Sequence, residues 1–119
     1  MKCLDTYILM EIANQNNKFL KYIDEDFIIT NETLAEFIWV ILRDQNENLA
    51  EIWYKKLESY CANVNLNILV KAMKFRFKNK HRRLSFFDCV GYIYALENKI
   101  KFVTGDKEFE HLENVEFVK

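Results

Sequence analysis

The chain has 119 residues, of which half are hydrophobic and 15% are aromatic, and its formal net charge is −1. This composition predicts one domain with a dense core, spanning residues 1–119, and argues against disorder, because disordered chains lack apolar surface to bury. The near-zero net charge gives the whole molecule no strong attraction to nucleic acid, so any such attraction must come from a local patch.

No stretch reaches the roughly 18 apolar residues that a membrane-spanning helix needs. The N-terminal stretch MKCLDTYILMEIANQ is interrupted by acidic residues, so a signal peptide is not expected. The three cysteines lie far apart, which is typical of reduced thiols, and the two histidines share no metal-ligand spacing with each other or with a cysteine. We therefore expect a cytoplasmic protein that makes no membrane contact and has no zinc site.

The first half of the chain alternates short apolar runs with stretches of helical spacing. Its expected elements are, in chain order, a strand over 2–6, a helix over 7–15, a short helix over 19–23, a strand over 27–29, a long helix over 30–43 and a helix over 49–60. The chain contains no proline and only two glycines, which suits a helix-rich fold with short connections.

The second half continues the alternation. Its expected elements are a short strand edge over 63–67, helices over 68–78 and 85–98, a strand over 100–103, one or two helical turns over 107–112 and a last strand over 115–118. Strands that alternate with helices predict an α/β fold, here a three-layer α/β/α domain with a small, mostly parallel central sheet flanked by helices. In such sheets, sites form outside the carboxyl ends of the strands.

Four carboxylates lie after predicted strands or among apolar residues, where a charged side chain is unusual. Asp5 directly follows the first predicted strand, and Asp106 follows the strand over 100–103 after a Thr-Gly pair. Glu36 and Asp88 lie among apolar residues, in TLAEFIWVIL and LSFFDCVGYIYAL, and no lysine or arginine nearby in the sequence is an obvious partner for either. If the two strands are neighbours, the carboxylates of Asp5 and Asp106 meet at one edge of the sheet.

Each acid taken alone also fits a structural role at a helix start. TLAE and SFFD have the spacing of a capping box, and Asp5 and Asp106 each precede a predicted helical segment that they could cap. Four carboxylates gathered at one edge would repel each other, and a divalent cation such as Mg²⁺ or Mn²⁺ is the simplest compensation. A hard cation that keeps water among its ligands can activate that water for phosphodiester hydrolysis.

The four acids in their surroundings LDTYIL, TLAEF, SFFDCVGYIYAL and FVTGDKEF resemble the PIN-domain nucleases, especially the VapC-type toxins of prokaryotic toxin–antitoxin pairs. The resemblance covers the whole chain in length and order and is strongest in the last third, whereas residues 44–83 carry little of it. The resemblance implies catalytic, metal-binding roles for the acids and orienting roles for two hydroxyls, the residues being Asp5, Glu36, Asp88 and Asp106, with Thr6 and Thr104.

Two positions near these acids complicate the comparison. The family usually has asparagine directly after Asp-Thr, and Tyr7 stands there in this chain. Glu32 is a rival for the second acid, because it lies four residues before Glu36 and shares its helix face. We prefer Glu36, because TLAEF matches the family and Glu32 fits better as a first-turn acid that the helix dipole favours.

The stretch KAMKFRFKNKHRR, residues 71–83, concentrates positive charge in a chain of near-zero net charge. One interpretation is contact with RNA phosphates, with Phe75 or Phe77 stacking on a base. The other is a solvated surface with both phenylalanines in the core, which their helical spacing favours. The residues expected to bind RNA are Lys78, Lys80, Arg82 and Arg83.

The favoured hypothesis is a Mg²⁺- or Mn²⁺-dependent endoribonuclease in which metal-activated water attacks phosphorus and leaves a 5′-phosphate, the polarity that the resemblance implies. The resemblance also implies a protein antitoxin and a homodimer. An alternative is a catalytically silent PIN-like module that binds RNA or a protein partner, which Tyr7 supports. A phosphatase with an aspartyl nucleophile lacks support, because no second aspartate follows two residues after Asp5.

Overall fold

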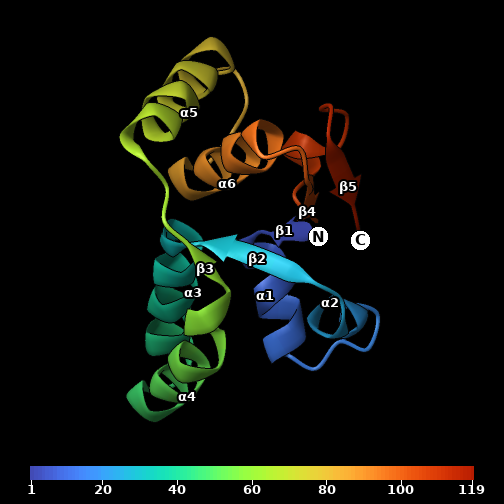
Figure 1. The fold of residues 1–119 in the computed structure, drawn as a ribbon. Coiled ribbons are helices and arrows are strands. Elements are labelled where there is room, and N and C mark those ends of the chain that lie inside the picture. Colours follow the sequence, from blue (N-terminus) through green and yellow to red (C-terminus); the bar gives the residue numbers. More distant parts are fainter.

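Five short strands form one sheet, and every neighbouring pair of strands is parallel. The computed structural model describes residues 1–119. The strands are β1 (Lys2–Leu4), β2 (Phe27–Thr30), β3 (Cys61–Ala62), β4 (Lys101–Thr104) and β5 (Val115–Phe117), in the spatial order β3-β2-β1-β4-β5 (Figure 1). The predicted α/β fold with a parallel sheet flanked by helices is confirmed.

Six α-helices and two 3₁₀ turns connect the strands. The α-helices are α1 (Thr6–Ala13), α2 (Lys21–Asp24), α3 (Asn31–Asp44), α4 (Glu47–Leu57), α5 (Leu66–Lys78) and α6 (Phe86–Glu97), and the 3₁₀ turns are η1 (Glu58–Tyr60) and η2 (Lys107–Phe109). Asparagine side chains begin two of the helices: Asn46 accepts from the amide of Leu49 and Asn65 from that of Ile68. These caps satisfy backbone donors that a helix start leaves free.

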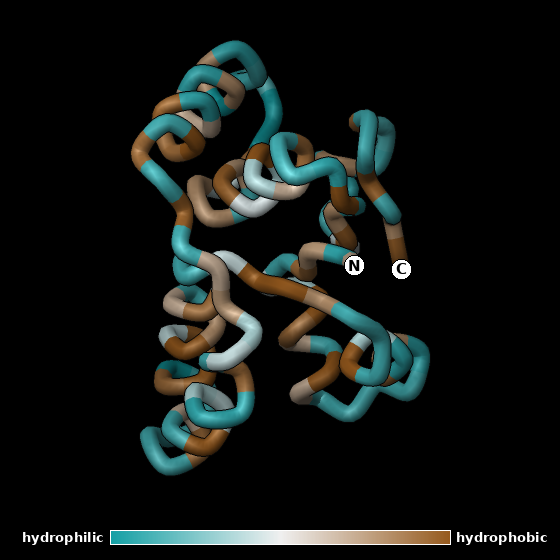
Figure 2. The backbone as a smooth tube through the Cα atoms, in the orientation of Figure 1, coloured by the Kyte–Doolittle hydropathy of each residue, from teal (hydrophilic) through white to brown (hydrophobic).

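The strands divide the core into two layers, because successive side chains of a strand point to opposite faces. Leu4 and Val103 pack on the face covered by α1 and α3, whereas Cys3 and Phe102 pack on the face covered by α5 and α6. Figure 1 shows α1 to α4 on one side of the sheet and α5 and α6 on the other. In Figure 2, β2 is hydrophobic between the two layers and the loops at its starting end are hydrophilic.

Two local predictions are wrong. The strand expected over 63–67 lies instead at Cys61–Ala62, because Asn65 bonds the amide of Ile68 and starts α5. The capping box expected at TLAE does not form, because Thr30 caps α3 and Thr33 lies inside the helix. At SFFD the cap does form, and the hydroxyl of Ser85 accepts from the amide of Asp88 at 3.0 Å.

The order of the strands defines one switch point in the sheet. From β1 the chain builds β2 and β3 on one side and then returns to add β4 and β5 on the other side of β1. The strands β1 and β4 therefore flank the point where open α/β sheets bind ligands. Asp5 follows β1 and Asp106 follows β4, so the two acids belong to this edge.

No helix is both long and apolar enough to span a membrane.

Candidate metal centre at the carboxyl edge of the sheet

Asp5 is fully buried at the end of β1. One carboxylate oxygen accepts from the amide of Ile8 at 3.1 Å and so caps α1, and the other accepts from the hydroxyl of Thr104. The amide of Asp5 donates to the carbonyl of Val103 at 3.2 Å. Asp5 can therefore cap a helix and also belong to the acidic cluster, because its carboxylate caps α1 with one oxygen and bonds Thr104 of β4 with the other.

Asp106 is held by the same threonine. Its amide donates to the hydroxyl oxygen of Thr104 at 3.0 Å, and its carboxylate accepts from the amide of Glu108 at 3.0 Å, which caps η2. The Thr104 hydroxyl therefore accepts from the backbone of Asp106 and donates to the carboxylate of Asp5. This shared hydroxyl links the two acids that are 101 positions apart in the chain.

Glu36 and Asp88 come from the two helical layers. Glu36 is half-buried on α3, and the hydroxyl of Thr6 donates to its carboxylate at 2.5 Å. The Thr6 hydroxyl thus gives Glu36 a hydrogen-bond partner, although no lysine or arginine near Glu36 in the sequence was an obvious one. Asp88 is half-buried in the first turn of α6, a helix that contacts α3, β1 and β4. Both helices therefore bring a carboxylate toward the edge where Asp5 and Asp106 lie.

The pKa values of Asp5 and Asp88 respond to the charges of neighbouring acids. Burial raises the pKa of Asp5 well above its usual value, and the charges of Asp88 and Asp106 raise it further, against the opposing hydrogen bonds from Thr104 and Ile8. Burial also raises the pKa of Asp88 to about 7, with the charges of Glu36 and Asp106 adding to the effect.

No lysine or arginine pairs with any of these four acids. The edge therefore carries a cluster of negative charge that no lysine or arginine pairs with.

The donor set has the chemistry that a hard divalent cation prefers, namely carboxylate oxygens with hydroxyl groups behind them. A carboxylate oxygen of Glu32, one helical turn before Glu36, is also buried without a hydrogen-bond partner. No three His, Cys, Asp or Glu side chains, however, are arranged so that they could hold a metal ion as they stand. The acids thus fit Mg²⁺ or Mn²⁺ in their chemistry, without a formed ligand shell.

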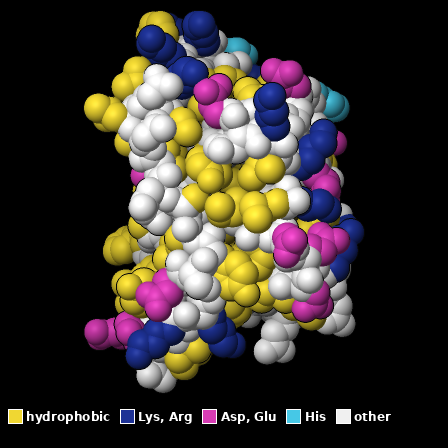
Figure 3. Space-filling model, in the orientation of Figure 1, with side chains coloured by type: hydrophobic (Ala, Val, Ile, Leu, Met, Phe, Trp, Pro, Cys, Tyr) yellow, Lys and Arg dark blue, Asp and Glu magenta, His cyan; other side chains and the backbone are white.

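The basic run lies beside this edge. A guanidinium nitrogen of Arg82 donates to the carbonyl of Glu108 at 2.9 Å, and the amide of Arg83 donates to the Glu108 carboxylate at 3.4 Å. Glu108 lies in η2, two residues after Asp106, so these contacts hold the loop before α6 next to the acids. Sequence reasoning missed Glu108, because no spacing links it to residues 25 positions earlier. Lys and Arg side chains gather at the upper end of the face in Figure 3.

The two phenylalanines of the basic run have different environments. Phe75 packs against Tyr92 with ring centroids 5.1 Å apart, whereas Phe77 is 68% exposed, with the ammonium of Lys80 at 4.8 Å from its ring. The prediction of two core phenylalanines is therefore wrong for Phe77. Residues two apart on a helix point in nearly opposite directions, so only one of the pair can face α6.

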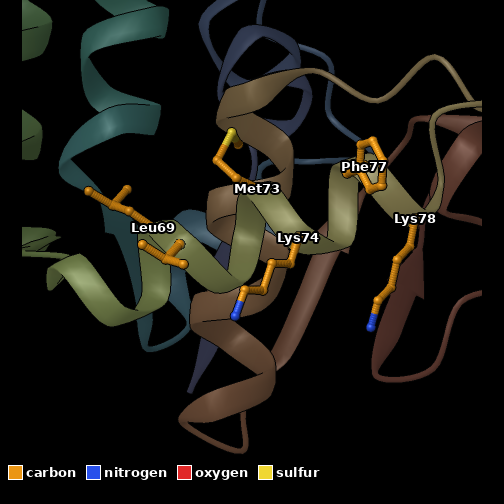
Figure 4. Close-up of a pocket in the computed structure, with 6 residues that line it drawn as sticks. Leu69, Met73, Lys74, Phe77 and Lys78 are labelled. Atoms are coloured by element: carbon orange, nitrogen blue, oxygen red, sulfur yellow. The ribbon is translucent and has the colours of Figure 1, made fainter.

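The exposed side of α5 carries a shallow groove that contains the Phe77 ring. The groove has a volume of about 420 Å³ and is lined by Leu69, Val70, Met73, Lys74, Phe77 and Lys78. Figure 4 shows the lysines extending from the same helix alongside the apolar side chains. Lys78 ends α5, and Lys78 and Lys80 are both exposed. The predicted RNA-binding residues thus extend from the acidic edge to the end of α5.

Comparisons with known proteins agree with this architecture. A family model described as PIN domain matches residues 2–115. The crystal structure of Mycobacterium tuberculosis VapC20, described as a toxin that cleaves the sarcin-ricin loop, has a TM-score of 0.84 at 15% identity, with all of both chains covered.

Two solved complexes show a similar likeness. A toxin–antitoxin complex from Klebsiella pneumoniae has a TM-score of 0.76 at 15% identity, covering 98% of this chain and 96% of that one. VapBC-1 from nontypeable Haemophilus influenzae has a TM-score of 0.71 at 19% identity, covering 99% and 96%. No curated protein sequence gives a significant match. At these identities the solved structures establish a shared fold.

Proposed function

We propose that this chain, which belongs to the PIN-domain family, is a Mg²⁺- or Mn²⁺-dependent endoribonuclease that hydrolyses RNA phosphodiester bonds. The observation that carries the proposal is the burial of Asp5 beside Asp88 without any protein cation, which raises the pKa of both carboxyl groups. Strongly perturbed carboxylates at the switch point of a parallel sheet are the expected signature of a functional site.

In the proposed site, Asp5, Glu36, Asp88 and Asp106 would hold the cation. When bound, it supplies Lewis acidity and activates water at neutral pH. Thr104 orients Asp5 and Asp106 through its shared hydroxyl, and Thr6 orients Glu36. Asp88 orients the attacking water, which displaces the 3′ oxygen in line and leaves a 5′-phosphate end.

The substrate contacts proposed for RNA lie along the basic run. Arg82 and Arg83 are beside η2 and hold the phosphates next to the scissile bond, and Lys78 and Lys80 hold phosphates farther away. The exposed ring of Phe77 lies among these cations and offers a stacking surface for an unpaired base. Positive charge next to a cluster of carboxylates suits an anionic substrate that would be cleaved at a divalent cation.

A role as the toxin of a toxin–antitoxin pair acting in the cytoplasm is the biological setting we propose. The solved relatives include a toxin–antitoxin complex and VapBC-1, and their fold covers nearly all of this chain. In this setting the partner is a protein antitoxin, and its binding suppresses RNA cleavage. Co-expression with the product of the neighbouring reading frame tests this, because a true antitoxin co-purifies with the chain and lowers its activity.

A homodimer is proposed through the outer face of α3. This face is a shallow groove lined by Asn31, Leu34, Ala35, Ile38, Trp39, Leu42 and Tyr54, none of which is charged. Trp39 is 61% exposed, and two copies can approach here without like-charge repulsion. The groove on α5 is less suited to self-pairing, because Lys74 and Lys78 line it. Light scattering of Trp39→Asp should show a monomer, with Phe77→Asp still dimeric.

The central test is cleavage of a mixed RNA substrate by Asp5→Asn and Asp88→Asn. Both variants should stay folded by circular dichroism and lose cleavage, and excess chelator should abolish the activity of the unaltered chain. Glu116→Gln is the matched control, because Glu116 is a half-buried carboxylate outside the proposed site. Full activity of both aspartate variants, or activity that persists in chelator, contradicts the proposal.

A second candidate is a catalytically silent module that binds RNA or a protein. It is favoured by one observation, that no three acidic side chains are arranged to hold an ion. Thermal unfolding with Mn²⁺ separates the two candidates. A site that binds only the folded state stabilises it by about 2.7 kcal/mol when Mn²⁺ is at 100 times the dissociation constant. A silent module shows no Mn²⁺-dependent rise in Tm.

A further inference from the structure

Tyr7 and Gly105 are in unusually close contact beside the acidic edge of the sheet. A Cβ atom built on Gly105 would lie 2.2 Å from Cε1 and 2.5 Å from Cδ1 of the Tyr7 ring, distances that real Cβ atoms essentially never show. The φ angle of Gly105 is not positive, so its backbone conformation does not itself call for glycine. The space taken by the Tyr7 ring is therefore what excludes a side chain here.

The Tyr7 ring also packs against the core. The buried ring of Phe19 meets it edge-on, with centroids 6.0 Å apart and planes at 64°. The half-buried Tyr7 ring therefore contacts both Phe19 and Gly105. These two contacts restrict where the ring can move, because close-packed interiors have few voids to receive a displaced group.

The contact joins the two segments that carry the acids of the first and fourth strands. Tyr7 comes directly after Asp5-Thr6, and Gly105 stands between Thr104 and Asp106. The Thr104 hydroxyl links the carboxylate of Asp5 to the amide of Asp106, but a glycine between them leaves the intervening backbone free to rotate. The Tyr7 ring removes that freedom by packing on the glycine.

We propose that Tyr7 is a positioning residue whose ring packs on Gly105 and fixes Asp106 relative to Asp5 for cation binding. The inference rests on the proposed function and deepens it. The support that Tyr7 gives comes from ring packing on Gly105. The hydroxyl of Tyr7 has no part in this role, so a phenylalanine should replace it.

Isothermal titration of the full-length chain with Mn²⁺ alone, without RNA, tests the inference. Tyr7→Phe should keep the dissociation constant within about twofold, whereas Tyr7→Ala and Gly105→Ala should each weaken binding by about tenfold, the lower end for groups that orient metal ligands. The double variant should bind no more weakly than Tyr7→Ala, because the added methyl group enters the space that the ring has left. Tyr7→Leu replaces Tyr7→Ala if that variant is unfolded.

Gly91→Ala is the matched control. A methyl group there would also approach an aromatic ring, at 2.9 Å from Cε1 of Phe102, but in the core between α6 and β4. It should lower Tm and leave the Mn²⁺ dissociation constant unchanged, which separates a general loss of packing from a loss of positioning.

Three results would overturn the inference. Unchanged Mn²⁺ affinity in Tyr7→Ala and Gly105→Ala would reject it while leaving the proposed function intact. Additive losses in the double variant would show that the two residues act separately. Absence of Mn²⁺ binding by the unaltered chain would reject both the proposed function and this inference.

Discussion

Two regions of this molecule hold buried or half-buried carboxylates, and the surroundings shift the pKa values of these groups in opposite directions. On β5, Glu116 accepts from the hydroxyl of Tyr22 at 2.5 Å and pairs with the ammonium of Lys2 at 3.0 Å. Burial alone would raise the pKa of Glu116, but these two partners outweigh it, and the pKa is lowered. At the acidic edge, burial raises the pKa of Asp5 and of Asp88, and the charges of neighbouring carboxylates raise both further.

The difference shows which carboxylates are already satisfied by the fold. Glu116 has a cation and a hydroxyl, so it contributes to stability and has little left to offer a ligand. Asp88 has neither a lysine nor an arginine as partner, and its hydrogen bond with Ser85 does not outweigh burial, so its negative charge calls for protonation or for a cation from outside the chain. Partner supply, rather than burial, therefore separates the candidate site from a structural ion pair.

The largest expected effect is on catalysis. Glu36→Gln and Asp106→Asn should lower kcat/KM for RNA cleavage by at least about 100-fold, since even the residues behind metal ligands are often worth that much. Glu116→Gln should change kcat/KM less than about twofold, because that carboxylate is satisfied by Lys2 and Tyr22. Single-turnover cleavage assays measure both, and equal losses in the three variants would remove the distinction between the two regions.

The next effect concerns stability without metal. The pKa of Asp88 is raised from 3.8 to about 7 in the folded state, so the folded chain holds this proton more tightly than the unfolded chain does. Stability should therefore fall as pH rises from about 4 to about 7, and the loss should be complete above that range. Asp88→Asn should be more stable than the unaltered chain at pH 8 by about 1–3 kcal/mol.

Urea unfolding in chelator at pH 5 and pH 8 measures this effect. The difference in free energy of unfolding between Asp88→Asn and the unaltered chain should be larger at pH 8 than at pH 5. The same difference at both pH values would show that the charged form of Asp88 is not disfavoured in the folded chain.

Glu116 should show the opposite sign. Its lowered pKa means that its contribution is fully present above the usual value of 4.5 and is lost as pH falls through the folded-state pKa. Glu116→Gln should lower the free energy of unfolding at pH 7 by about 1–2 kcal/mol, because Lys2 loses its charged partner. Thermal unfolding between pH 3 and pH 7 tests this, and a deficit that persists undiminished at pH 3 would contradict it.

The smallest effect belongs to a surface ion pair. Lys71 and Glu97 are 2.8 Å apart, but their side chains are 45% and 39% exposed. Lys71→Met should change the free energy of unfolding by less than about 0.5 kcal/mol, because solvent screens exposed pairs. Repeating the measurement in 1 M salt provides the check: a larger change would show that the pair is coupled to more of the structure than its exposure indicates.

Local patterns gave much of the fold and misplaced some of its details. The apolar runs identify β1, β2, β4 and β5, because a short continuous apolar run is typical of a buried strand. The error at residues 63–67 arises because Asn65 prefers to cap a helix, a choice that depends on the backbone following it. Phe77 was misjudged because helical spacing shows which residues share a side, but not which side meets a neighbouring helix.

The alternation of strands and helices, and the acids at strand ends and helix starts, can be read from the chain alone because these signals are local. The fold is needed to show that the Thr104 hydroxyl bonds Asp5, that Thr6 supports Glu36 and that Tyr7 packs on Gly105. Those three contacts link residues from 30 to 99 positions apart, and their geometry follows from the order in which the strands pair, which no local pattern specifies.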